Sequence, residues 1–127
     1  MEKKIIVAAN APAPIGPYSQ AVAYNNMLFV SGQIAINPQT GDLVMDSIAN
    51  ETTQVMANLQ AILTEAGLNF NNVLKTTIFL SDMKYFAEVN GIYANYFSSN
   101  PPARETVQVA GLPKNVNVEI SVIAGMA

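Results

Sequence analysis

The chain has 127 residues and a formal net charge of −3, with six basic residues and neither cysteine nor histidine. This composition excludes disulfides, thiolate nucleophiles, imidazole bases and most transition-metal sites. Nucleic acids and acidic membranes are poor partners, because binding them needs clustered cations and the sequence has no such cluster.

Charged residues make up only 12% of the chain, whereas about 25% is usual. A surface with so little charge favours self-association. The apolar run after Lys4 is shorter than the core of a signal peptide, and no stretch approaches the ~20 apolar residues of a membrane span. We therefore expect one cytoplasmic domain over residues 1–127, with no metal and no cofactor.

Three strands are expected before the first helix. KKIIVAA predicts a short strand, and the prolines of NAPAPIGPYSQ then exclude regular structure. AVAYNNMLFVSGQIAI predicts a hairpin that turns at Asn25 and Asn26. A helix follows from an N-cap at Asp46 or Ser47 to a C-terminal stop at Gly67. Its apolar face, at helical spacing, consists of Val55, Leu59, Ile62, Leu63 and Ala66.

The second half of the chain predicts a strand, a helix and two further strands. NNVLKTTIFL is typical of a strand, and its more apolar alternate set is expected to face the helices: Leu74, Thr76, Ile78 and Leu80. Ser81 or Asp82 caps the next helix, which Asn100, Pro101 and Pro102 end. Its inner face consists of Phe86, Val89, Tyr93 and Phe97. The last strands are expected near 103–109 and 116–124.

The predicted order is therefore β-β-β-α-β-α-β-β. It indicates an α+β fold in which two helices cover one face of a single mixed sheet. The other sheet face is left open, which again favours an oligomer.

The most specific chemical feature is Arg104, the only arginine in the chain. Strand alternation places Arg104 and Thr106 on one face of their strand and Glu119 on one face of the last strand. If these two strands pair as a hairpin, a suitable register brings Arg104 near Glu119. Such a pair is either a pocket with one guanidinium and one carboxylate, or a structural ion pair between strands. The residues alone leave both interpretations open.

Three further residues are weaker candidates. Tyr18 on a Pro/Gly loop either presents its hydroxyl to a ligand or packs over the edge of the core. Gly32 in SGQI either lets a ligand approach the backbone or marks a bulge. Asn90, next to Val89, is favoured as a satisfied polar group over a direct ligand.

Five stretches in order, IGPYSQAV, LFVSGQI, NVLKTTIFLSDM, VNGIYANYF and PPARETVQVAGLPKNVNVEISVIA, resemble the RidA (YjgF) family over essentially the whole chain. The resemblance implies a chorismate-mutase-like fold and a homotrimer with pockets between subunits. It also implies hydrolysis of 2-enamines and 2-imines (2-aminoacrylate, 2-iminopropionate, 2-iminobutyrate) to 2-keto acids and ammonia. These reactive compounds leak from pyridoxal-phosphate-dependent amino-acid dehydratases.

The resemblance also implies roles for individual residues. Arg104 grips the substrate carboxylate, Glu119 positions or activates water, and Tyr18 reaches the pocket from a neighbouring subunit. The resemblance also implies that Ser31, Gly32, Gln33 and Thr106 bind substrate, Thr106 through its backbone N–H. Asn90 completes the candidate substrate-binding set, although the family motifs do not assign it. Many members carry cysteine at the position of Thr106, so thiol-dependent roles are excluded here.

Two alternatives belong to other classes of function. A non-catalytic module that binds 2-keto acids would use the same Arg104 pocket. A ribonuclease or translation inhibitor, a label that some family members carry, is disfavoured by the acidic balance and by the lack of histidine and of a basic stripe.

Overall fold

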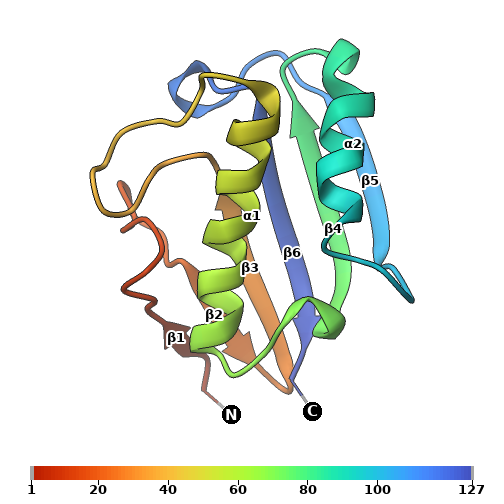
Figure 1. Ribbon diagram of the computed structural model, residues 1–127. Helices are drawn as coiled ribbons and strands as arrows, with labels where there is room; N and C mark the ends of the chain where they lie inside the picture. The colour runs from red at the N-terminus through yellow and green to blue at the C-terminus, as the bar shows by residue number, and fades with distance from the viewer. Residues whose placement is uncertain (1, 127) are drawn as a thin grey trace.

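The computed structural model describes residues 2–126, in which a six-stranded sheet is covered on one face by two helices (Figure 1). The helices are α1 (Ile48–Glu65) and α2 (Phe86–Ala94). The strands are β1 (Lys4–Ile6), β2 (Ala21–Tyr24), β3 (Met27–Gln33), β4 (Val73–Leu80), β5 (Ala103–Gln108) and β6 (Val118–Gly125).

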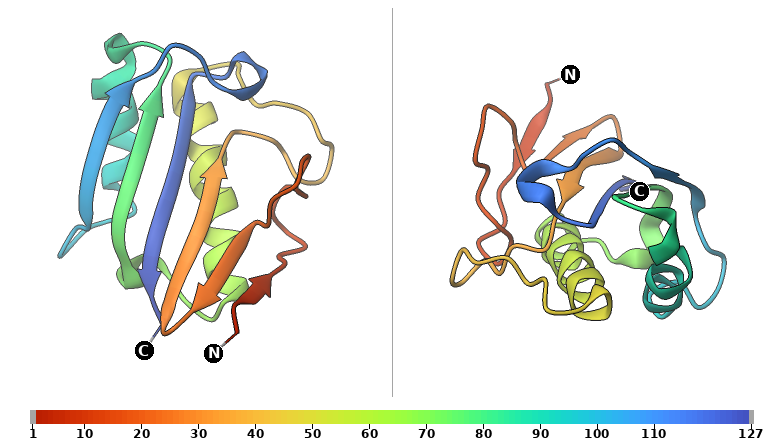
Figure 2. Two further views of the ribbon diagram at one scale, coloured as in Figure 1. Left: turned by 180° about the vertical axis from the view of Figure 1, so that it is seen from behind. Right: turned by 90° about the horizontal axis from the view of Figure 1, so that it is seen from above.

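The strands lie in the order β1-β2-β3-β6-β4-β5, and all neighbours are antiparallel except β4 and β5. Helix α2 connects this parallel pair, as a crossover between parallel strands requires. The predicted order of elements and the mixed sheet are confirmed. Figure 2, left, shows the second sheet face, which neither α1 nor α2 covers.

The residues that were predicted to cap the first helix, to end it and to form the hairpin turn do so in the structure. The Ser47 side chain accepts a hydrogen bond from the Asn50 N–H at 3.0 Å and so caps α1. Gly67, just past the C-cap, has a φ of +78°, a value that glycine adopts without steric cost. Asn25 and Asn26 have φ values of 50° and 63° and form the tight turn between β2 and β3.

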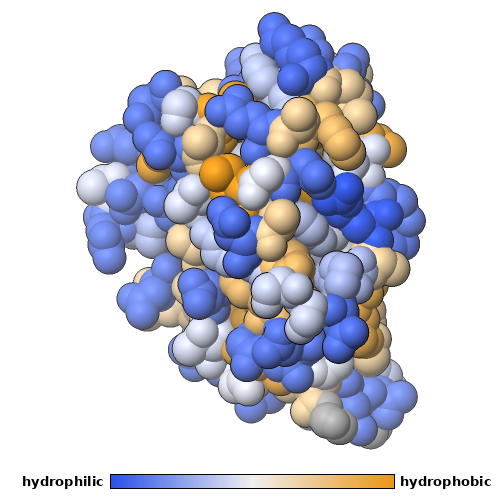
Figure 3. Space-filling view, turned by 45° about the vertical axis from the view of Figure 1, so that its right-hand side comes forward, coloured by the Kyte–Doolittle hydropathy of each residue, from blue (hydrophilic) through white to orange (hydrophobic). Residues whose placement is uncertain are grey.

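The core lies between the helices and the sheet. Helix α1 buries Val55, Leu59 and Ile62 completely, and α2 buries Val89 and Tyr93. The open face also carries apolar side chains, since Ile5, Phe29 and Val107 are between 43% and 46% exposed. On the side of the molecule that carries α2 and β5, hydrophilic residues predominate, with smaller apolar areas among them (Figure 3). Among the described residues, no helix is long and apolar enough to cross a membrane.

Two local predictions were wrong. Leu74 was expected to face the helices, but the pairing of β4 with β6 shifts between Val73 and Lys75. This bulge buries Val73 and leaves Leu74 exposed. The second helix ends at Ala94, before the predicted Asn100, and Phe97 then packs edge-to-face on Phe70 with 5.4 Å between ring centroids.

The last two strands do not pair as the hairpin that would bring Arg104 near Glu119. Strand β4 lies between β5 and β6, because the β4-α2-β5 crossover places β5 beside β4 at the sheet edge. Arg104 is aligned with Thr76, which is buried under the helices, so its side chain is on the helix-covered face. Glu119 lies between the buried Val118 and Ile120 and therefore projects from the open face.

Candidate functional site

The candidate residues form two groups on opposite faces of the sheet. We call the first the Glu119 pocket, a cavity of about 350 Å³. Its lining consists of Pro12, Ala13, Ile15, Tyr18, Gln20, Ser31, Gly32, Gln33, Ile34, Ile36, Pro113 and Glu119. The second group, which we call the Arg104 edge, consists of Asn90, Arg104 and Thr106 at the α2 and β5 side of the sheet.

Glu119 supplies the charge in its pocket. Burial raises the pKa of its carboxyl above the ordinary value, because an ionised carboxylate loses hydration there. No hydrogen bond or ion pair from a described residue reaches this carboxylate. A half-buried acid with a raised pKa and no partner is well suited to accept a proton or to hold a water molecule.

Gly32 makes room for that carboxylate. The pairing of β3 with β6 shifts between Val30 and Gln33, so Gly32 lies in an irregular part of the strand beside Glu119. A β-carbon at Gly32 would come within 2.5 Å of Glu119 Oε2 and 2.8 Å of its Cδ. The bulge interpretation of this glycine is confirmed, and the side chain that approaches its backbone closely is that of Glu119. Close approach of a ligand at Gly32 stays a prediction.

The residues around Gly32 hold the pocket together. Ser31 Oγ donates to the Ser19 carbonyl at 2.6 Å, and Gln33 Nε2 donates to the Ser31 carbonyl at 3.2 Å. Gln20 is buried and bonds to the backbone of Ala8, Ala11 and Pro12. These bonds tie the proline-rich loop to the end of β3, so the loop has a defined position over the pocket.

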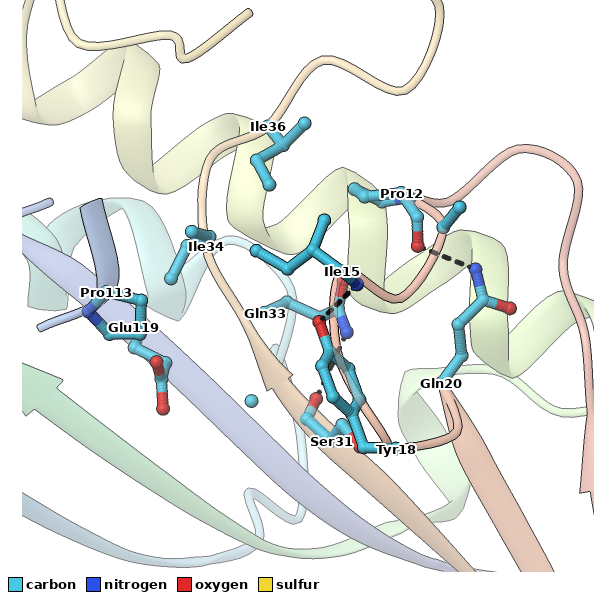
Figure 4. A pocket seen from close by; sticks show the side chains of 12 residues that line it. Pro12, Ile15, Tyr18, Gln20, Ser31, Gln33, Ile34, Ile36, Pro113 and Glu119 are labelled. Carbon is cyan, nitrogen blue, oxygen red and sulfur yellow. Dashed lines mark hydrogen bonds between the residues drawn. The ribbon is translucent and has the colours of Figure 1, made fainter. Parts of the chain in front are cut away.

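Tyr18 lies on that loop and faces the cavity (Figure 4). Its hydroxyl oxygen accepts a hydrogen bond from the Ile15 N–H at 3.4 Å, and the side chain is 49% exposed. The phenol therefore remains able to donate its own proton to a ligand. In this chain Tyr18 and Glu119 line the same cavity.

At the other group, α2 orients the guanidinium of Arg104. Its Nη1 donates to Asn90 Oδ1 at 2.6 Å, and Cζ lies 5.0 Å from the centroid of the Tyr93 ring. The hydroxyl of Tyr93 is in turn bonded to Thr76 at 2.8 Å. A guanidinium has five N–H donors in a fixed fork, so this support leaves donors available for a carboxylate. Asn90 thus acts through Arg104, in agreement with the satisfied-polar interpretation.

Thr106 follows Arg104 on the edge strand. Val109 donates its N–H to Leu80 at 2.9 Å. Because backbone groups of a strand alternate in direction, the N–H of Thr106 points away from β4. Its hydroxyl oxygen is buried without a hydrogen-bond partner among the described residues. Both groups are suited to a ligand that reaches the sheet edge.

The structure thus brings Tyr18, Ser31, Gly32, Gln33 and Glu119 together, and it brings Arg104, Asn90 and Thr106 together. It does not bring Arg104 to Glu119, because their strands are separated by β4 and their side chains are on opposite faces. A substrate that needs both groups requires more than one copy of the chain.

Sequence reasoning missed Glu51, which is completely buried in the first turn of α1. Its carboxylate accepts the Asn117 N–H at 2.7 Å and the Val118 N–H at 3.0 Å, and its other oxygen accepts Asn117 Nδ2. It therefore anchors the segment immediately before Glu119. Its spacing from Val55 and Leu59 could have revealed it, because an acid in an apolar helical face must find donors.

The fold and the site define a small α+β protein that has a pocket with its own carboxylate, Glu119, and a separate sheet edge whose guanidinium, Arg104, can bind an anion. The family described as Endoribonuclease L-PSP matches residues 8–126. The chain therefore belongs to this family, which is the RidA (YjgF) family.

Individual relatives agree with this membership. The chain is 50% identical to a RutC family protein of Pyrococcus horikoshii, with 96% of this chain and 97% of that protein covered. It is 48% identical to a 2-iminobutanoate/2-iminopropanoate deaminase of Mus musculus, with coverage of 96% and 90%. The crystal structure of E. coli TdcF with bound serine matches with a TM-score of 0.93 at 39% identity, over 98% of this chain and 99% of that one.

Proposed function

We propose that the protein hydrolyses 2-imino and 2-enamino acids to 2-keto acids and ammonia. The observation that carries the proposal is the Glu119 carboxylate, which is half buried, has no cation or hydrogen-bond donor among the described residues, and has its pKa raised by burial. The mouse relative is named for deamination of 2-iminobutanoate and 2-iminopropanoate, and the E. coli relative holds serine, itself an amino acid with a carboxylate.

The chemistry needs few groups. The guanidinium of Arg104 holds the substrate carboxylate through two parallel hydrogen bonds, and the Thr106 N–H supports it. Water adds to the carbon of the protonated imine while Glu119 accepts its proton. The resulting amino alcohol transfers a proton to nitrogen, expels ammonia and leaves the 2-keto acid. An enamine first takes a proton at its terminal carbon and becomes the imine. Tyr18 donates a hydrogen bond to the polar end of the substrate.

We propose that neighbouring subunits of a homotrimer share this site. Each copy presents two different surfaces, the Glu119 pocket and the Arg104 edge, on opposite sheet faces. A contact between two unlike surfaces is heterologous, and heterologous contacts close into a ring of subunits when the rotation from one subunit to the next is suitable. The exposed apolar side chains of Ile5, Phe29 and Val107 favour burial of the open sheet face between subunits.

A cytoplasmic location and a functional link to pyridoxal-phosphate-dependent dehydratases complete the proposal. A 2-keto acid binding module would use the same two groups without turnover, so a turnover assay separates the two functions. The family description names a ribonuclease, but the net charge of −3 argues against binding a polyanion. RNA cleavage by purified protein that persists in Arg104→Ala would favour that activity.

The sharpest test mixes two inactive variants. Arg104→Ala and Glu119→Gln are each expected to lose deaminase activity. When the two variants are refolded together in equal amounts, about a quarter of the wild-type activity should return. In randomly mixed rings, a quarter of the contacts between neighbouring copies join an intact Arg104 to an intact Glu119. The matched control replaces the Glu119→Gln partner with the double variant and should remain inactive.

Two further results decide the proposal. Analytical ultracentrifugation should give a species near three times 13.6 kDa at micromolar concentration. A stable monomer, or mixed trimers without recovered activity, would overturn the shared site. Absence of turnover by the wild-type protein with freshly generated iminopropionate would overturn the deaminase itself.

A further inference from the structure

Arg104 has no acidic partner within its own copy of the chain. Among the described residues, the one ion pair joins Lys75 Nζ to Glu105 Oε1 at 2.8 Å, and it does not include Arg104. Glu105 is the nearest acid in sequence, but strand alternation directs its exposed side chain to the open sheet face, away from that of Arg104. No carboxylate of the described residues therefore neutralises the guanidinium.

Helix α2 supports this charge with three neutral side chains. Phe86, Asn90 and Tyr93 are four and three residues apart, so they lie on one face of α2, and Figure 1 shows α2 in front of β4 and β5. The guanidinium Cζ lies over both rings, 5.7 Å from the Phe86 centroid and 5.0 Å from the Tyr93 centroid. Asn90 Oδ1 accepts a hydrogen bond from Nη1 at 2.6 Å. The faces of aromatic rings carry partial negative charge and so attract the cation.

The ring of Tyr93 is itself held in place. Its hydroxyl and that of Thr76 share a hydrogen bond of 2.8 Å, and both residues are buried. The ring also packs on Phe97, with 4.7 Å between the ring centroids. Thr76 is aligned with Arg104 in the parallel pairing of β4 and β5. The support therefore runs from β5 through α2 to β4, which gives the guanidinium a fixed place relative to the sheet.

These contacts restrict the guanidinium without neutralising it. A carboxylate in place of the Asn90 amide would bind it more strongly, but it would compete with the substrate carboxylate for the same donors. We propose that Phe86 and Tyr93 are positioning residues for Arg104, and that together with Asn90 they fix the guanidinium and leave its charge to the substrate. The long arginine side chain is then ordered when the chain folds and not when the substrate binds. This inference rests on the proposed function.

The first experiment removes one ring. Phe86→Leu keeps an apolar side chain of similar bulk and should fold. Ordering a long side chain on binding lowers affinity about 2- to 13-fold, so the calorimetric Kd for 2-ketobutyrate should rise by that factor. With iminopropionate, KM should rise and kcat should fall, because the grip on the carboxylate sets the position of the imine carbon. Phe70→Leu is the matched control, since Phe70 is also half buried against the core but packs on Tyr96 and Phe97.

The guanidinium can also be observed directly by NMR, because it is the only one in the chain. With ¹⁵N-labelled arginine, its N–H signals in the wild type should be shifted upfield by the rings of Phe86 and Tyr93, and should exchange slowly with one another. In Phe86→Leu, without any ligand, the shift should decrease and the exchange should be faster. Thr76→Val/Tyr93→Leu, which leaves no hydroxyl of this pair unpaired, should act in the same direction. A residue that serves the fold alone would change neither signal.

Asn90→Asp tests whether the support must be neutral. The new carboxylate makes a stronger, charge-assisted bond to Arg104, so the melting temperature should be maintained or raised. Affinity for 2-ketobutyrate should nevertheless fall at least about tenfold, because the new charge lies close to the ligand carboxylate and repels it. Gln60→Glu adds the same charge at an exposed position of α1 and is the control. A purely structural role for Asn90 predicts that the affinity is kept.

The outcomes separate the two claims. If the wild-type protein binds 2-ketobutyrate but turns over no imine, the proposed function fails, and the affinities still decide the role of α2. The positioning proposal is overturned, and the deaminase stands, if Phe86→Leu leaves the affinity and the NMR signals unchanged or if Asn90→Asp binds 2-ketobutyrate as tightly as the wild type. If Phe86→Leu does not fold, unshifted and rapidly exchanging guanidinium signals in the wild type would overturn it equally.

Discussion

Replacing Gly32 with alanine should displace the Glu119 carboxylate without unfolding the protein. The new β-carbon would lie 2.5 Å from Oε2, 2.8 Å from Cδ and 3.0 Å from Cγ of Glu119. Carbon atoms in ordinary contact are about 3.5–4.0 Å apart, so the carboxyl group must move by roughly 1 Å. The obstructing atoms are the far end of a flexible side chain, which can rotate away.

The energetic cost to the fold should be small. Gly32 does not have the positive φ found at Gly41 and Gly67, so alanine is compatible with its backbone. Loss of glycine's freedom in the unfolded chain adds about 0.4–1 kcal/mol of stability, which offsets part of the rotamer change. We expect a melting temperature within a few degrees of the wild type.

The effect on catalysis should be much larger. A misplacement of about 1 Å can cost around 100-fold in rate, so kcat with iminopropionate should fall by that order. Gly91→Ala is the matched control, because a β-carbon there meets no atom within 4 Å. Since Gly91 lies inside α2, this control should also raise the free energy of unfolding by about 0.5–1 kcal/mol. Full activity of Gly32→Ala would refute the reasoning that the position of Glu119 limits the reaction.

Four further predictions concern charged side chains. Arg104→Lys keeps the charge but loses the planar fork, so kcat/KM should fall about 10- to 150-fold with the fold intact; wild-type turnover would make the arginine structural. Glu119→Gln should keep calorimetric binding of 2-ketobutyrate while turnover falls about 10²- to 10⁴-fold, whereas joint loss of both would mean that Glu119 only supports binding. The third prediction uses the Arg104→Ala variant, in which no guanidinium from a neighbouring copy can offset the burial of Glu119. The pKa of Glu119 is raised by burial, so its carboxyl binds a proton more tightly in the folded protein than in the unfolded chain. Ionisation of this carboxyl therefore lowers the free energy of unfolding as the pH rises through its folded-state pKa. In this background, Glu119→Gln should raise the melting temperature at neutral pH and have no effect below the pKa of an ordinary glutamate. The opposite trend in melting temperatures measured across pH would contradict the burial argument. Glu51→Ala leaves the N–H groups of Asn117 and Val118 unpaired and should lower the urea-derived free energy of unfolding by about 2–6 kcal/mol, with Glu51→Gln closer to the wild type.

The order of elements was predictable because its signals are local. Ser47 caps α1 through its own side chain, and Asn25 and Asn26 adopt left-handed φ values that most residues avoid. Each of these features is decided within about four residues of sequence. The same holds for the helical stop at Gly67.

The strand pairing was less accessible, because it depends on contacts distant in sequence. Alternation correctly placed Arg104 and Thr106 on one face of their strand, yet it could not show that β4 lies between β5 and β6. The bulge beside Leu74 likewise reverses the direction of one side chain, and no local signal marks it.

The candidate site was predictable only as a set of residues. The motifs identified Tyr18, Gly32, Arg104 and Glu119, but not their division between two sheet faces. The apolar lining of the Glu119 pocket was also not predicted, because Ile15 and Ile36 belong to segments without periodicity and come together only through the fold.

Arg104 is the only arginine in the chain, and it lies where the substrate carboxylate is expected. A dicarbonyl reagent selective for guanidinium groups therefore has a single target in the unaltered polypeptide. Intact mass spectrometry would count one adduct per chain, and the rate of its formation would report how often the group is accessible. If 2-ketobutyrate slows the modification, the decrease in rate would give the fraction of Arg104 that is occupied by the ligand. This measurement needs no mutation and could be made in cell extracts as well as in purified protein.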